Sequence, residues 1–195
     1  MDEIGAIILA AGESSRLGYP KQFLLHHEKT LIERAVEAAE LCRPIVVIGG
    51  RDYAKVAEVL KGSPAIIIEN TEWESGIGTS IRRGVDEALG LSPELNALLL
   101  MVCDQPFVTP DLIATLIERR IRSNRSIIAC RYSDTLGVPA IFDRSLFPRL
   151  RSLPDDSGAK RIIQSNRENV EGVDFPGGEI DIDTETDRES YLRGG

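Results

Sequence analysis

The fold is decided near the start of the chain, where the sequence reads Ile4-Gly5-Ala6-Ile7-Ile8-Leu9-Ala10-Ala11-Gly12. This apolar run has the length of a β-strand. Further strand-length runs lie at 44–48, 65–69 and 97–103, and segments with helical spacing of apolar residues separate them, as in Leu31-Ile32-Ala35-Val36-Ala39. Such alternation is typical of an α/β fold with a largely parallel sheet.

Helix-capping signals fix the start of several helices. Thr30-Leu31-Ile32-Glu33 forms a capping box, and Thr109-Pro110-Asp111 combines an N-cap threonine with proline at the first helical position. The second of these helices is expected to run to about Asn124. Shorter strands are expected at 126–131, 138–142 and 178–182, and Thr184 is expected to cap a C-terminal helix. Without repeats, linkers or breaks in composition, residues 1–195 are expected to form one domain.

Composition excludes several classes of protein. The 195 residues carry a formal net charge of −8, which opposes broad binding to a phosphate backbone. The longest apolar runs, 6–11 and 97–103, are far shorter than the roughly 20 residues of a membrane span. The start of the chain does not resemble the basic region of a signal peptide. We therefore expect a cytoplasmic protein that binds neither nucleic acid nor membrane.

The cysteines and histidines argue against two common kinds of site. Cys42, Cys103 and Cys130 stand far apart, so one must stay unpaired in any monomeric disulfide scheme, which suits a reducing compartment. No Cys/His spacing of a zinc site is present. The only histidines are the neighbours His26 and His27, which makes a Ser-His-Asp or Cys-His nucleophile improbable.

A glycine-containing loop follows the first strand and runs Leu9-Ala10-Ala11-Gly12-Glu13-Ser14-Ser15-Arg16-Leu17-Gly18-Tyr19-Pro20-Lys21-Gln22. Small residues let the backbone approach a ligand, and successive amides there can converge on phosphate. Five residues separate Gly12 from Gly18, so the Walker spacing fails, and the G-x-G-x-x-G dinucleotide pattern is also missing. The alternative is a surface loop in which Arg16 and Lys21 are merely solvated.

Acidic residues mark two candidate metal positions. Asp104 directly follows an apolar strand, where a carboxylate can hold Mg²⁺ beside bound phosphates; a turn aspartate is the alternative. Asp181 and Asp183 alternate along a predicted strand, so both point to one side and either could be a second ligand; helix capping is the alternative. The segment Gly76-Ile77-Gly78-Thr79-Ser80 could contact a base edge or simply cap a helix.

Together these motifs resemble a known family. The pattern from Leu9 to Gln22 resembles the nucleotide-binding signature of MobA-like nucleotidyltransferases. Four further motifs look like the molybdenum cofactor cytidylyltransferase branch. They are the terminal Asp181-Ile182-Asp183-Thr184, Asp104-Gln105-Pro106, Gly137-Val138-Pro139-Ala140 and Asp156-Ser157-Gly158-Ala159-Lys160. Pro154-Asp155-Asp156 departs from the glycine that usually precedes the last of these.

The resemblance implies a single Rossmann-like, three-layer α/β domain of the nucleotide-diphospho-sugar transferase type, with CTP as nucleotide, Mg²⁺ as cofactor and a molybdopterin-type acceptor. It also implies a molybdoenzyme or its maturation chaperone as partner. Arg16 and Lys21 would neutralise the β- and γ-phosphates, and Asp104 and Asp183 would hold metal. The remaining implied nucleotide-binding residues are Leu9, Ala10, Ala11 and Gly12 through their backbone, and Gly78 and Ser80 on the base side.

Several alternatives stay open at this stage. Uridylyl-transferring relatives share Ala10-Ala11-Gly12, and another phosphorylated small molecule could be the acceptor. A non-catalytic nucleotide-binding module and a Rossmann-type dehydrogenase are the competing functions. A nucleotidyl transfer mainly requires positioning and charge neutralisation and needs no protein nucleophile. The scarcity of histidine is therefore compatible with this reaction. Arg131, Lys160 and Arg161 are candidates for a local basic wall that offsets the net negative charge.

Overall fold

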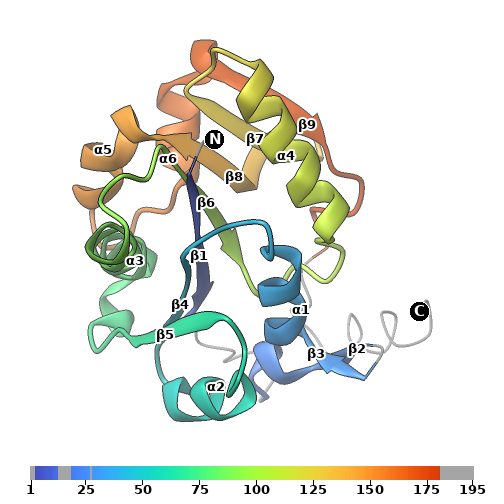
Figure 1. The fold of residues 1–195 in the computed structure, drawn as a ribbon, viewed down its shortest axis with the longest axis vertical. Coiled ribbons are helices and arrows are strands. Elements are labelled where there is room, and N and C mark those ends of the chain that lie inside the picture. Colours follow the sequence, from blue (N-terminus) through green and yellow to red (C-terminus); the bar gives the residue numbers. More distant parts are fainter. Residues whose placement is uncertain (1–2, 13–18, 27, 181–195) are drawn as a thin grey trace.

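The protein is an α/β/α sandwich around one large sheet (Figure 1). The structure, a computed structural model, describes residues 3–12, 19–26 and 28–180. The sheet has the strand order β5-β4-β1-β6-β8-β7-β9. Its strands are β1 (Ile4–Ala10), β4 (Ile45–Gly49), β5 (Ala65–Glu69), β6 (Ala97–Val102), β7 (Ile127–Tyr132), β8 (Thr135–Asp143) and β9 (Val170–Asp174).

All strands of this sheet except β8 run in one direction. β1 pairs in parallel with β4 on one side and β6 on the other, β4 pairs in parallel with β5, and β7 with β9. β8 is antiparallel to both β6 and β7. A mostly parallel α/β sheet is therefore confirmed. A second, two-stranded sheet joins β2 (Leu25–His26) to β3 (Lys29–Thr30).

Helices cover both faces of the sheet. One side carries α1 (Leu31–Ala38), α2 (Tyr53–Val59) and α4 (Pro110–Arg122), and the other carries α3 (Ile77–Leu91), α5 (Phe147–Arg151) and α6 (Lys160–Ser165). Side chains of a strand alternate between the two layers, so Ile8 faces the first group and Ile7 the second. Every residue of β1 is buried, as expected for a parallel strand covered on both faces.

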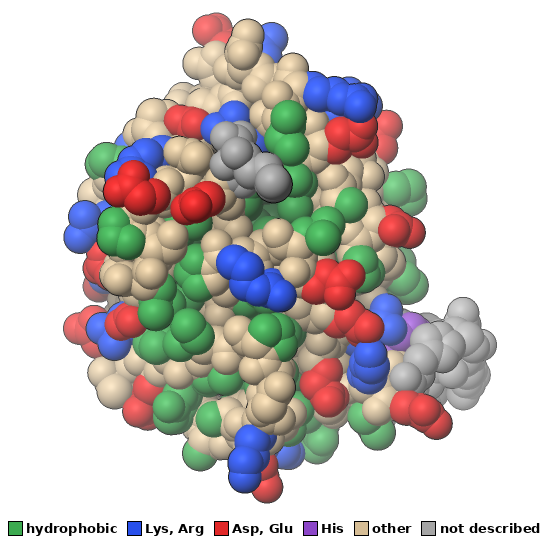
Figure 2. All heavy atoms as spheres, in the orientation of Figure 1, with side chains coloured by type: hydrophobic (Ala, Val, Ile, Leu, Met, Phe, Trp, Pro, Cys, Tyr) green, Lys and Arg blue, Asp and Glu red, His purple; other side chains and the backbone are tan. Residues whose placement is uncertain are grey.

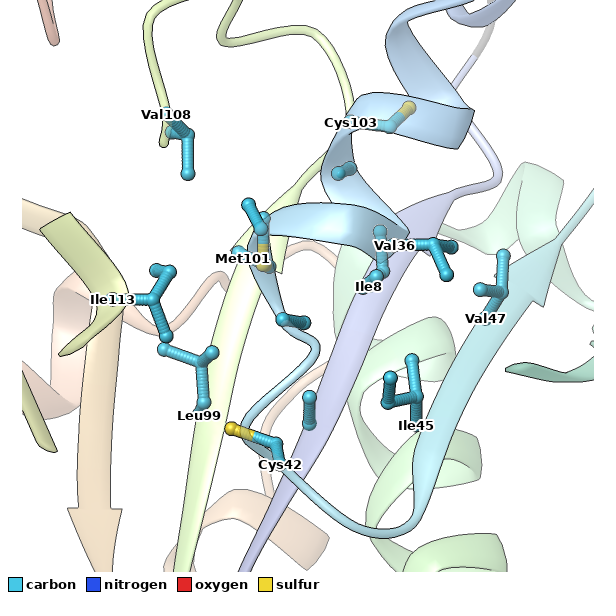
Figure 3. Close-up of a cluster of buried hydrophobic side chains, with 14 of the residues drawn as sticks. Ile8, Val36, Cys42, Ile45, Val47, Leu99, Met101, Cys103, Val108 and Ile113 are labelled. Atoms are coloured by element: carbon cyan, nitrogen blue, oxygen red, sulfur yellow. The ribbon is translucent and has the colours of Figure 1, made fainter. Parts of the chain in front are cut away.

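The first core layer is shown in Figure 3, where aliphatic side chains from three neighbouring strands meet those of α1 and α4. Val47, Ile8 and Leu99 come from β4, β1 and β6, and Val36 and Ile113 come from the two helices. Burial of each such side chain stabilises the fold by about 1.5–3 kcal/mol. This packing fixes the positions of the strand ends where ligands bind in open parallel sheets.

The helix caps predicted at Thr30 and Thr109 are confirmed. Thr30 Oγ1 accepts a hydrogen bond from the Glu33 amide (3.3 Å), and Glu33 Oε2 accepts one from the Thr30 amide (2.7 Å), which completes the capping box of α1. Thr109 Oγ1 accepts a hydrogen bond from the Leu112 amide at the start of α4, with Pro110 at the first position.

The predicted strand at 178–182 is wrong over its described part. Phe175-Pro176-Gly177-Gly178 forms a turn in which Gly177 has φ +88° and the Gly178 amide donates to the Phe175 carbonyl. Proline at the second position and glycine with positive φ at the third are typical of a type II turn. The strand lies earlier, at β9, and residues 181–182 and the predicted helix after Thr184 lie outside the described residues.

The surface in view carries mixed charges. Figure 2 shows Lys and Arg side chains interspersed with Asp and Glu, so no extended region of one sign covers this face. Among the helices that the structure describes, none combines the length and apolarity needed to cross a bilayer.

We expect Thr30→Ala to lower the free energy of unfolding by about 1 kcal/mol, because the Thr30 hydroxyl accepts from the Glu33 amide and donates to Glu33 Oε2, and alanine makes neither hydrogen bond. Urea denaturation followed by circular dichroism measures the change. Thr30→Ser is the matched control, since it keeps the hydroxyl and should stay close to the parent. Equal losses in both variants would show that the cap does not stabilise α1.

Candidate active site

A cavity of about 580 Å³ opens at the carboxyl ends of the central strands. The register places Leu9 of β1 level with Ile48 of β4 and Val102 of β6, and the Cys103 amide continues the ladder by donating to the Leu9 carbonyl. Three chain segments therefore leave the sheet side by side. The cavity is lined by Leu9, Ala10, Ala11, Gly12, Lys21, Gln22, Trp73, Glu74, Gly76, Ile77, Ser80, Val102, Cys103 and Asp104.

Small residues form the floor of this cavity at the end of β1. Apart from its neighbours in the chain, no described residue has an atom within 4 Å of the position that a Cβ on Gly12 would take. A Cβ on Gly50, at the end of β4, would lie 2.9 Å from the Ala11 carbonyl oxygen and from Cγ of Trp73. Glycine at position 50 therefore lets the Trp73 ring approach the β1 end closely.

A lysine and an aspartate from distant parts of the sequence meet in the cavity. Lys21 Nζ lies 3.8 Å from Asp104 Oδ2, and the two side chains are 15% and 32% exposed. Asp104 follows β6, whereas Lys21 begins the short helix η1 (Lys21–Phe23). The sequence prediction that both residues belong to one site is consistent with this juxtaposition.

The segment that carries Lys21 is held by α2 and the core. Phe23 is buried, and the buried Gln22 donates to Asp52 Oδ2 (3.3 Å) just before α2. The ammonium of Lys55 lies 4.2 Å from the centre of the Phe23 ring, which is cation–π geometry. Sequence reasoning missed this support, because no spacing rule relates Gln22 to a helix thirty residues further along.

Asp104 is supported from the opposite side. The next residue, Gln105, is buried and its Nε2 donates to the Gly178 carbonyl (2.9 Å), so residues near 178 lie beside the end of β6. Gln105 Oε1 finds no partner among the described residues. The predicted site residues Arg16 and Asp183, and the alternative ligand Asp181, lie outside the described residues.

The predicted base-side residues have different environments. Ser80 lines the cavity, and its Oγ accepts a hydrogen bond from Asn70 Nδ2 (2.9 Å). Gly78 is not among the lining residues, because its amide donates to the Asp155 carbonyl and a Cβ there would collide with the Pro154 carbonyl oxygen. The structure thus brings Ser80, but not Gly78, to the cavity.

The segment Pro154-Asp155, where the sequence departs from the usual glycine, contacts α3 outside the cavity lining. Arg82 Nη2 pairs with Asp155 Oδ1 (2.6 Å), and Arg82 Nη1 donates to the Leu153 carbonyl. None of the predicted basic-wall residues lines the cavity. Arg131 pairs with Asp174, Arg161 donates to Ser157 Oγ, and Lys160 begins α6.

Known proteins share both the sequence pattern and the architecture. Residues 6–170 match the MobA-like NTP transferase domain. The chain belongs to the MobA-like NTP transferase family. It is similar to a crystal structure of Rv0371c from Mycobacterium tuberculosis, with 28% identity, a TM-score of 0.81, and coverage of 98% of this chain and 97% of the other. A nucleotidyl transferase from Methanothermobacter has 21% identity and a TM-score of 0.81, which supports the fold alone.

The relatives of this chain carry names that describe different activities. Nicotine blue oxidoreductase from Paenarthrobacter nicotinovorans is 28% identical over 96% of this chain and 95% of its own length. A probable molybdenum cofactor guanylyltransferase from Peptoclostridium acidaminophilum is 29% identical over 64% of this chain. The alignment spans only 54% of that guanylyltransferase, about half its length.

The cavity of this MobA-like domain offers suitable chemistry for a divalent cation. No group of three or more His, Cys, Asp or Glu residues within 3–12, 19–26 and 28–180 could hold a metal. The partly exposed Asp104 carboxylate supplies one hard oxygen ligand, and Mg²⁺ commonly takes its other ligands from substrate phosphates and water. Rv0371c has also been crystallised with manganese; that structure is 26% identical, has a TM-score of 0.78, and covers 99% of this chain and all of its own.

Cys103 lines the cavity but has the properties of an inert thiol. Burial, reinforced by the neighbouring Asp104 charge, raises its pKa far above the ordinary range, so it stays protonated at neutral pH. Burial also raises the pKa values of Cys42 and Cys130 to about 12. All three thiols are free and buried, and a protonated thiol is a poor nucleophile.

We expect the folded chain to lose stability as the pH rises above about 9. The folded state holds thiol protons that the unfolded state releases near the ordinary pKa of 9.0, so this contribution is complete below 9 and is lost between 9 and about 12. Urea midpoints at pH 8 and 10 measure the loss. A thiol reagent at pH 8 should label the three cysteines only after unfolding; rapid labelling of the native chain would contradict the account.

Proposed function

We propose that this chain transfers a cytidylyl group from CTP to a terminal phosphate of a molybdopterin-type acceptor and releases pyrophosphate. The proposal is carried by one observation, the 3.8 Å approach of Lys21 Nζ to Asp104 Oδ2 inside a cavity with a small-residue floor. A cation for phosphates and an oxygen ligand for a metal thereby stand side by side. A nucleotidyl transfer requires these two features more than it requires a protein nucleophile.

The proposed reaction is an in-line displacement. An acceptor phosphate oxygen attacks the α-phosphorus of CTP, the new oxygen–phosphorus bond forms, and the bond to the bridging oxygen breaks so that pyrophosphate leaves. Bound Mg²⁺ would neutralise charge on the phosphates. Lys21, with Arg16, would stabilise the negative charge that grows on the leaving group, Asp104 would hold the metal, and Asp183 would be a second ligand.

The choice of CTP over the other nucleotides rests on the sequence. Ala10-Ala11-Gly12 differs from the Ala-Gly-Gly associated with guanylyl transfer, and these small residues lie on the cavity floor. The relatives named molybdenum cofactor guanylyltransferases leave GTP as the principal competitor. A phosphorylated small molecule such as a sugar phosphate is the alternative acceptor. We further propose a cytoplasmic enzyme that delivers its product to a molybdoenzyme or its maturation chaperone.

A second candidate is oxidoreductase activity. The relative that aligns over nearly the whole chain is named nicotine blue oxidoreductase. Against this candidate, the loop after β1 lacks the glycine spacing of a dinucleotide site, and Lys21 with Asp104 suits a metal–triphosphate group better than a hydride donor. Oxidation of NADH or NADPH by nicotine blue, without pyrophosphate release from any nucleotide, would favour it.

We expect pyrophosphate to be released from CTP in the presence of Mg²⁺ and molybdopterin. The assay compares CTP, UTP, GTP and ATP under identical conditions. CTP should exceed GTP and ATP by at least about tenfold in kcat/KM, because one unpaired base group suffices for that ratio. Preference for GTP would reject cytidylyl transfer while keeping nucleotidyl transfer, and no pyrophosphate from any nucleotide would reject both.

We expect Asp104→Asn to lower the rate of pyrophosphate release by on the order of 10²-fold or more. The change keeps the shape of the side chain but removes the negative charge that would hold the metal, so the Mg²⁺ concentration for half-maximal rate should also rise. Asp111→Asn is the matched control, because Asp111 lies in the first turn of α4 and not in the cavity. Parent-like turnover of Asp104→Asn at saturating Mg²⁺ would contradict the assignment.

A further inference from the structure

Trp73 and Glu74 are cavity residues without a role in the mechanism above. Trp73 and Glu74 belong to η2 (Trp73–Ser75), between β5 and α3, and both line the cavity together with Ala11 and Gly12. Trp73 is the sole tryptophan of the chain and is half-buried, and Glu74 is exposed. An aromatic face and a carboxylate at one wall of a nucleotide-sized cavity can recognise a base by stacking and by hydrogen bonding.

Hydrogen bonds fix the backbone of residues 72–76, the segment that carries these two side chains. The Glu72 amide donates to Asn70 Oδ1 (3.0 Å), the Glu72 carbonyl accepts from Thr79 Oγ1 (3.2 Å), and the Gly76 amide donates to the Trp73 carbonyl (3.2 Å). Gly50 lets the indole pack closely on the ends of β1 and β4. The Trp73 ring therefore has a fixed support before any ligand binds.

Sheet topology places this wall opposite the charged end of the cavity. Trp73 and Glu74 follow β5, and Asp104, with Lys21 beside it, follows β6. The Trp73 ring packs beside Gly50, at the end of β4, and in the order β5-β4-β1-β6 two strand spacings of about 4.8 Å, roughly 10 Å in all, separate β4 from β6. A nucleotide whose phosphates lie at Lys21 and whose sugar crosses the β1 end would bring its base to the β5 side.

We propose that Trp73 and Glu74 select the base, an inference that rests on the proposed nucleotidyl transfer. Trp73 packs against the face of the pyrimidine, and the Glu74 carboxylate accepts a hydrogen bond from the exocyclic amine of cytosine. Uracil presents a carbonyl oxygen at the same position, which a carboxylate repels. Glu74 thereby sets the preference for CTP over UTP.

The stacking half of the proposal is tested by tryptophan fluorescence of the full chain with Mg²⁺. CTP should quench the emission of Trp73, whereas inorganic tripolyphosphate, which lacks a base, should not. Trp73→Leu should raise the Kd for CTP, measured by calorimetry, by about tenfold. Calorimetric binding of CTP without a change in emission would overturn the stacking and leave the proposed function standing; no binding of any nucleotide would overturn both.

The hydrogen-bonding half is tested by Glu74→Gln. An amide can donate to the uracil carbonyl, so the ratio of the Kd for UTP to the Kd for CTP should fall by about tenfold. Glu72→Gln is the matched control, because Glu72 lies two residues before Glu74 and its side chain does not line this cavity, so the ratio should not change. A ratio that stays at the parent value in Glu74→Gln, with CTP still bound, would overturn the assignment. Because binding is measured without turnover, this result does not depend on the acceptor.

Discussion

Parallel pairing of β1 with both β4 and β6 is the constraint on which the site depends. β1 is buried along its whole length, and each neighbour pairs with it in a register that leaves the three strand ends level. Helices cover both faces of the sheet, and a cavity of about 580 Å³ lies at the strand ends. Loss of this register would separate Asp104 from the Ala11-Gly12 backbone.

The charge of the site is local and differs from that of the chain. A net charge of −8 opposes anionic substrates at long range. Lys21 counteracts this within the cavity, where it lies 3.8 Å from Asp104 and is only 15% exposed, so solvent screens it less than a surface lysine. A metal bound at Asp104 would add positive charge at the same place. In the proposed function, recognition of a triphosphate would therefore depend on a few placed charges rather than on a basic surface.

Much of the fold could be predicted because its signals are local. The apolar run of β1 and the Thr30 capping box each lie within a few consecutive residues, and the structure confirms both. The edge strand β9 was missed because Val170-Glu171-Gly172-Val173-Asp174 is only partly buried and has no alternating pattern. The strand predicted at 178–182 is wrong over its described part because Pro176 and Gly177 turn the chain.

The candidate site could be predicted only in part, for a similar reason. Asp104 and Lys21 are marked by short motifs, and the structure places both in one cavity, while their roles stay predictions. The amide of Gly78 is occupied by Asp155, a contact across 77 positions that no local pattern reveals. Trp73 and Glu74 enter the cavity because Gly50 and the order of β5, β4 and β1 bring them there. Such placement is a property of the tertiary structure.

The most direct test of the central claim is a crystal structure of the chain with Mn²⁺ and a non-hydrolysable CTP analogue, with the metal located by anomalous scattering. The account predicts a manganese ion bound jointly by the Asp104 carboxylate and the triphosphate oxygens, with the Lys21 ammonium on the β- and γ-phosphates. A nucleotide with its phosphates away from Lys21, or a manganese ion that does not contact Asp104, would contradict it.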